Sequence, residues 1–179
     1  MTKLRELKQR FSELEWDWDS GRAEEAWYMI NDALRRCRKP ERLEILRWAV
    51  LAYPASYDNE PRIWAGLVVL RESARELPEL LGHLVASRDY DDRKTAVQLV
   101  RAIQAEPYVA EPHAYDHLIL PLLADETWLS IDVVLALWES HPAEARAALE
   151  QLLRGPSAAY LREWLEKAGR DPAELGLIA

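Results

Sequence analysis

The stretch DYDDRKTAVQLVRAI, residues 89–103, decides the fold class because it joins a helix start to a helical apolar stripe. Asp89 to Asp92 place carboxylates where the first backbone N–H groups of a helix need acceptors. Apolar residues then recur three and four positions apart, at Ala96, Leu99, Val100 and Ile103. This spacing puts them on one face of a helix. The stretch therefore predicts an amphipathic helix that begins near Asp89.

The same spacing extends outward in both directions. Towards the N-terminus, stripes run from Leu4 to Trp18, Ala23 to Cys37, Leu43 to Val50 and Ile63 to Leu70. Towards the C-terminus, further helices are expected over 78–84, from about His113 to Ala124, across Ile131 to Trp138, from His141-Pro142, and after Gly155-Pro156. Pro40, Pro61 and Pro78 suit the first turn of a helix. No segment alternates apolar and polar residues between hairpin turns, so the predicted class is all-α.

Pairs of these predicted helices resemble one another at an offset of 37 to 38 residues. The pattern Leu80-Leu81-x-x-Leu84, then Ala96-x-x-Leu99-Val100, parallels Leu118-Ile119-x-x-Leu122, then Val133-x-x-x-Leu137. This offset falls in the range of helical-hairpin repeats. We expect one domain, residues 1–179, that forms a short α-solenoid of antiparallel hairpins: a helical cap over 1–39, hairpin repeats over 40–168 and a tail over 169–179. An irregular helical bundle is the alternative.

Residues 89–100 resemble the second helix of a HEAT repeat, in which an acid-rich turn leads into Arg, Ala and Leu at the spacing of Arg93, Ala96 and Leu99. The resemblance covers residues 78–168, and 41–77 more loosely. In the following copy, Ser130 stands where the arginine would fall. A HEAT-like repeat implies a fold of stacked hairpins and leaves the function open.

The charge balance narrows the classes of partner. The chain carries 31 Asp and Glu against 23 Lys and Arg, a formal charge of −8. Its overall field repels polyanions and attracts basic partners, so a protein partner is expected rather than nucleic acid. Cys37 is the single cysteine, which suits a reducing compartment. No apolar run approaches the roughly 20 residues of a membrane span, so we expect a cytoplasmic protein that does not bind membranes.

A candidate binding ridge follows from the expected stacking. If the hairpins stack in register, the turns within pairs, at 53–60, 87–92, 124–128 and 154–156, fall on one edge. Seven acids and four aromatics lie in these turns, against the bases Arg88 and Arg154. Aromatic anchors among carboxylates are typical of surfaces that bind basic proteins. The predicted partner-binding residues are Tyr53, Tyr57, Asp58, Glu60, Asp89, Tyr90, Asp91, Asp92, Asp125, Glu126 and Trp128.

Sequence signatures of a catalytic or metal site are weaker than those of the candidate binding ridge. The spacing of His113 and His117 would put two imidazoles on one helical face, half of a zinc or iron site, but a metal site needs further ligands. HEAT-like folds also occur in DNA glycosylases that use a Trp-lined cleft and an acid, and Trp128 with Asp132, at helical spacing, resembles that pairing. The net charge argues against that activity. We predict no catalytic residue, no resident metal and no cofactor.

The leading hypothesis is a non-catalytic protein-binding module that masks or scaffolds a basic partner. In size, charge and expected fold the chain is similar in general character to bacterial immunity proteins, which cover the active site of a toxin. The alternative is a HEAT-like enzyme, either a DNA glycosylase for alkylated bases or a His-ligated metal enzyme. A structural subunit that associates with itself is a third reading.

Overall fold

The computed structural model describes residues 3–13, 21–53, 59–125, 127–156 and 158–167. The secondary structure of these residues is helical and contains no strand, which confirms the all-α class. The chain divides into two compact units, Met1–Leu84 and Val85–Ala179. Across the described ranges, no helix combines the length and the apolar character that a membrane span requires.

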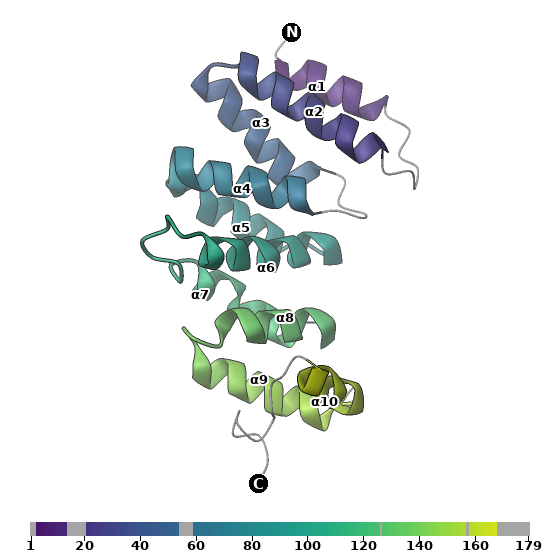
Figure 1. Cartoon of the computed structure of the whole chain (residues 1–179), viewed down its shortest axis with the longest axis vertical. Helices are drawn as coiled ribbons and strands as arrows, with labels where there is room; N and C mark the ends of the chain where they lie inside the picture. Colours follow the sequence, from purple (N-terminus) through teal and green to yellow (C-terminus); the bar gives the residue numbers. More distant parts are fainter. Residues whose placement is uncertain (1–2, 14–20, 54–58, 126, 157, 168–179) are drawn as a thin grey trace. The chain divides into compact units, whose positions relative to one another are not determined.

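The first unit is built from helices that lie where the apolar stripes predict them; the end of the first stripe, Leu14 to Trp18, lies outside the described residues (Figure 1). In chain order they are α1 (Lys3–Ser12), α2 (Gly21–Arg36), α3 (Lys39–Ala52), α4 (Glu60–Ser73), the 3-10 helix η1 (Ala74–Glu76) and α5 (Leu77–Val85). Pro40 and Pro61 lie in the first turns of α3 and α4, as predicted. Helix α3 packs on α4, and Arg47 on α3 pairs with Glu76 at 2.8 Å and with Glu79 at 2.9 Å.

Helix α4 buries a different face from the one predicted. Ile63, Leu67 and Leu70 are only half-buried, whereas Ala65, Val68, Val69 and Arg62 point into the unit. The Arg62 guanidinium is accommodated because its Nε donates a hydrogen bond of 2.7 Å to the carbonyl of Val50. Helix α4 is apolar on nearly all sides, so its residue spacing does not specify one inward face.

The second unit contains α6 (Tyr90–Ala105), α7 (Asp116–Ile119), the 3-10 helix η2 (Leu120–Ala124), α8 (Thr127–Leu137), α9 (Pro142–Arg154) and α10 (Ala158–Lys167). Helix α8 is the central element, since it packs on α6, η2 and α9, and α9 in turn packs on α10. The fully buried side chains of this unit include Leu99, Ile103, Ile119, Leu129 and Leu137.

Helix α6 forms as its sequence predicts. Asp89 is the N-cap residue, and its carboxylate accepts a hydrogen bond of 2.8 Å from the backbone N–H of Asp91. The predicted apolar stripe, Ala96, Leu99, Val100 and Ile103, is fully buried. Capping and burial therefore act together to fix where this helix starts and which way it faces.

The expected continuous helix from His113 to Ala124 is wrong. His113 lies in a turn, α7 is a single turn, and η2 continues as a 3-10 helix. Pro121 explains the break, because proline has no N–H to donate to His117 and its ring crowds the preceding turn. His113 and His117 therefore do not share one helical face.

Candidate protein-binding surface

The turn that leads into α6 is fixed by local hydrogen bonds. The Ser87 hydroxyl donates to a carboxylate oxygen of Asp92 at 2.7 Å and accepts from the backbone N–H of Asp89 at 3.1 Å. Asp89 is exposed, while Tyr90, Asp91 and Asp92 are half-buried. Carboxylates at this position also oppose the positive end of the helix dipole. The predicted acids of this turn are therefore held in defined positions at the start of α6.

Arg93 joins this turn to the one that precedes α8. Its Nε lies 2.6 Å from Oδ2 of Asp125, its Nη2 lies 3.0 Å from Oδ1, and its Nη1 donates to the Ser87 carbonyl at 3.2 Å. The Ser130 hydroxyl donates to the Asp125 backbone carbonyl at 3.0 Å. Two of the predicted turns, 87–92 and 124–128, are thus adjacent.

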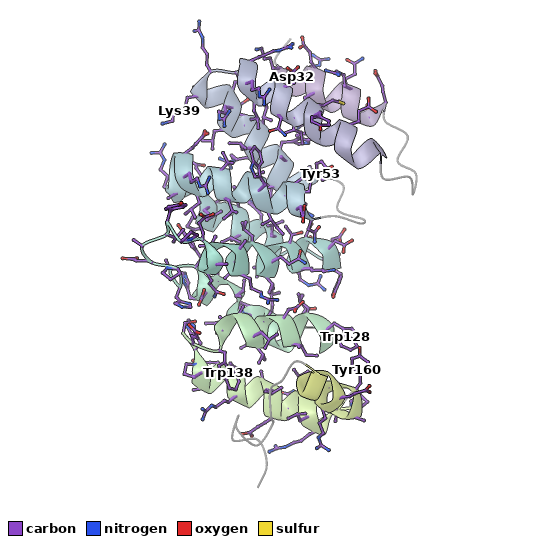
Figure 2. All side chains as sticks on the ribbon, viewed as in Figure 1. Asp32, Lys39, Tyr53, Trp128, Trp138 and Tyr160 are labelled. Atoms are coloured by element: carbon purple, nitrogen blue, oxygen red, sulfur yellow. The ribbon has the colours of Figure 1, made fainter. Side chains whose placement is uncertain are left out.

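An exposed aromatic pair lies at the start of α8 and α10. The rings of Trp128 and Tyr160 meet edge to face, with their centroids 4.7 Å apart (Figure 2). Trp128 is 49% exposed and Tyr160 is 53% exposed. Large aromatic rings that stay this open can bury further area against a partner. Trp138 directly follows the last residue of α8; its ring centre lies 5.8 Å from the Arg146 guanidinium, and it is not part of this pair.

We name the acidic–aromatic edge for its described residues: Asp89, Asp91, Asp92, Arg93, Asp125, Trp128 and Tyr160. Arg93 and Tyr160 were not in the predicted set. Arg93 lies one position after the 87–92 turn. It neutralises the charge of Asp125, which belongs to the turn before α8. The seven acids counted from sequence therefore overstate the free negative charge at these turns.

Tyr90 is half-buried in the first turn of α6, and the other predicted residues divide into three groups. Tyr53 is 3% exposed and belongs to the core of the first unit, so its ring is not open to a partner. This corrects its assignment as a surface anchor. Glu60 is exposed at the start of α4 in the first unit. Tyr57, Asp58 and Glu126 lie outside the described residues.

The negative charge of the chain is concentrated in the second unit. Residues 85–179 contain sixteen Asp and Glu against nine Lys and Arg, a formal charge of −7. Residues 1–84 contain fifteen against fourteen, a formal charge of −1. The unit that carries the acidic–aromatic edge therefore produces most of the field that attracts a basic molecule.

One of the two candidate metal residues, His113, is engaged in an internal network. The fully buried carboxylate of Asp116 accepts hydrogen bonds from Gln104 Nε2 at 2.8 Å and from Ser140 Oγ at 2.5 Å. Nδ1 of His113 lies 2.8 Å from the same carboxylate. His117 is exposed. In the part of the chain that the structure describes, no three His, Cys, Asp or Glu side chains are arranged to hold a metal ion.

Asp132 has the most unusual environment among the candidate acids. It lies one helical turn after Trp128, with Oδ1 3.5 Å from Nη1 of Arg101 on α6. Burial raises the pKa of the Asp132 carboxyl, and the opposing effect of Arg101 and Lys94 only partly offsets it. This arrangement is a local feature that suits the enzyme alternative.

Comparison with known proteins identifies no relative: no protein-family model matches the chain, and no curated protein or solved structure does.

Proposed function

We propose that this chain is a non-catalytic protein-binding module that masks or scaffolds a basic partner. The observation that carries the proposal is the exposed Trp128–Tyr160 pair in a unit with a formal charge of −7. Exposed Trp and Tyr are the residues that most often anchor a protein interface. Surrounding carboxylates speed the encounter with a positively charged surface.

The Arg93–Asp125 pair supports this proposal by making the edge rigid. It holds the start of α6 against the start of α8, so the carboxylates near α6 and the ring of Trp128 keep one arrangement in the free protein. A preorganised surface loses less conformational entropy on binding. We also propose that the helices form a short solenoid of stacked, HEAT-like antiparallel hairpins. A link between successive turns, such as the Arg93–Asp125 pair, would hold neighbouring hairpins together in that arrangement.

The mode of action that fits best is occlusion. In this proposal the protein acts in the cytoplasm and covers a basic surface of its partner, as an immunity protein covers the active site of a toxin. Long-range attraction brings the partner to the acidic–aromatic edge, and burial of the two rings slows its release.

Affinity capture from native cell extract with paired variants tests the proposal. Asp89→Asn with Asp91→Asn removes two charges but keeps an N-cap residue, because Asn caps helices as well as Asp. Trp128→Ala with Tyr160→Ala removes the anchors. Glu111→Gln with Glu144→Gln is the control, since it removes two exposed charges outside the edge. A basic protein retained by wild type and control but lost by both edge variants supports the proposal; equal retention by all four contradicts it.

A second candidate, a glycosylase for alkylated DNA bases, is favoured by Asp132 alone. The carboxylate would stabilise the sugar cation as the base departs, with Trp128 beside it and Arg101 near the backbone phosphates. Release of alkylated bases from DNA by the wild type, and its loss in Asp132→Asn, would establish this activity. No release by the wild-type protein would remove it.

A further inference from the structure

The first unit, although almost neutral, concentrates positive charge where α2 ends and α3 begins. The sequence RRCRKPER, residues 35–42, places Arg35, Arg36, Arg38 and Lys39 within five positions, and all four are exposed. Lys3 joins them from α1, because its Nζ donates to the Arg36 carbonyl and its backbone N–H donates to Glu41 Oε1 at 2.9 Å. We name these five residues the basic corner.

Most of this positive charge is not neutralised. Arg36 pairs with Asp32 on the preceding turn of α2 at 2.9 Å. The side chains of Arg35, Arg38 and Lys39 make no ion pair or hydrogen bond with the described residues. Glu41 on α3 accepts a hydrogen bond from the backbone N–H of Lys3 and keeps its negative charge, so the five cations of the corner face two acids, Asp32 and Glu41.

Arginines elsewhere on α3 show that pairing is the normal arrangement here. Arg42 lies 2.7 Å from Glu72, and Arg47 lies 2.8 Å from Glu76. In a chain with an excess of acids, three exposed cations within five positions of sequence that pair with none of the described residues are available to receive an anion from outside. The start of α3 adds to the positive potential, since its N-cap residue Arg38 makes no side-chain hydrogen bond to the helix, while Glu41 in the first turn offsets part of this effect.

We infer that the basic corner binds a small ligand through a polyphosphate group, such as the phosphate chain of a nucleotide. Guanidinium groups form forked hydrogen bonds to phosphate oxygens, and three of the five cations are arginines. A long polyanion would be repelled by the chain as a whole, whose formal net charge is −8. A short, densely charged group avoids most of that repulsion and still contacts several cations at once. The inference uses no residue of the acidic–aromatic edge.

Titration calorimetry with inorganic tripolyphosphate, with sulfate as the comparison anion, tests this inference. In 150 mM NaCl, a buffer of about physiological screening, the wild type is expected to bind one tripolyphosphate at least about tenfold more tightly than sulfate. Arg35→Glu with Arg38→Glu and Lys39→Glu is expected to abolish binding. Arg35→Lys with Arg38→Lys keeps the charge but loses the fork, and is expected to weaken binding severalfold.

The matched control separates a local site from a general charge effect. The control is a triple variant at exposed positions elsewhere: Arg75→Glu, Arg88→Glu and Arg154→Glu. Its net charge changes by the same amount as in the triple variant of the basic corner, and we expect it to keep tripolyphosphate binding. Circular dichroism of each variant verifies its helical content. Equal loss of binding in the control, or no binding by the wild type, would overturn the inference. Tighter binding of a short RNA or of vesicles with anionic lipid than of tripolyphosphate would overturn it also.

Discussion

Arg93 holds both carboxylate oxygens of Asp125 in a forked pair across 32 residues of sequence, with contacts of 2.6 and 3.0 Å. Each side chain is only 13% exposed, so solvent screens the pair weakly. The pair fixes the start of α8 against the start of α6. Together with the packing of α8 on α6, this contact sets the shape of the surface proposed to bind a partner.

We expect the Arg93–Asp125 pair to contribute measurably to the stability of the second unit. Arg93→Ala or Asp125→Ala leaves one partly buried charge unpaired, and each is expected to lower the free energy of unfolding by about 2–4 kcal/mol. A double-mutant cycle should give a coupling of more than about 1 kcal/mol. Urea unfolding measures both, with Arg36→Ala and Asp32→Ala as the exposed comparison, expected near 0.5 kcal/mol. Equal couplings for the two pairs would contradict the account.

Asp116 is expected to be essential for the stability of the second unit although it lies in no candidate site. Asp116→Ala removes the buried carboxylate that accepts from Gln104 and Ser140, so the partly buried Ser140 hydroxyl loses this acceptor and Gln104 keeps only the Ala136 carbonyl. The free energy of unfolding should fall by about 3 kcal/mol. His117→Ala, at an exposed position on the same helix, should change it by less than about 0.5 kcal/mol. Thermal unfolding that is the same in the two variants would show that the network is unimportant.

Tyr53 and Tyr160 are expected to respond in opposite ways to truncation. Tyr53→Ala removes a core ring and should cost about 3–5 kcal/mol of stability. Tyr160→Ala removes a half-exposed ring, so it should cost less than about 1 kcal/mol and instead reduce retention of the partner. Chemical denaturation and capture assays on both variants measure this contrast. A larger loss of stability from Tyr160→Ala would place that ring in the core.

The pH dependence of stability should report the raised pKa of Asp132. In the folded state the carboxyl holds its proton more tightly than in the unfolded chain, because burial disfavours the charge. Ionisation therefore lowers stability as the pH rises from the ordinary value of 3.8 through the folded pKa. Asp132→Asn should be more stable than the wild type at pH 7, with a difference that shrinks towards pH 3. A difference independent of pH would contradict the raised pKa.

Local sequence signals predicted the helices well where capping and burial coincide. Asp89 and the stripe from Ala96 to Ile103 predicted α6 correctly because each favours the same helix independently. The signals failed where two effects compete. Pro121 breaks the expected helix after His117, and α4 is too uniformly apolar for its inward face to be specified by spacing.

The candidate surface was only partly predictable from the sequence. The acids before α6 were found because turn residues lie at helix starts. Tyr160 was missed because its contact with Trp128 joins two helices 32 positions apart, and Tyr53 was misplaced because an aromatic residue beside a loop can equally face the core. Only the three-dimensional packing separates these cases.

The most direct test of the proposed binding edge is the rate at which a captured partner associates with immobilised wild type and with Asp89→Asn, Asp91→Asn. For the wild type, we expect the association rate constant to fall about tenfold or more between 50 and 500 mM NaCl, because salt screens the attraction. The double variant should associate more slowly at low salt and respond less to salt. Identical association rates for the two proteins at every salt concentration would contradict binding at this edge.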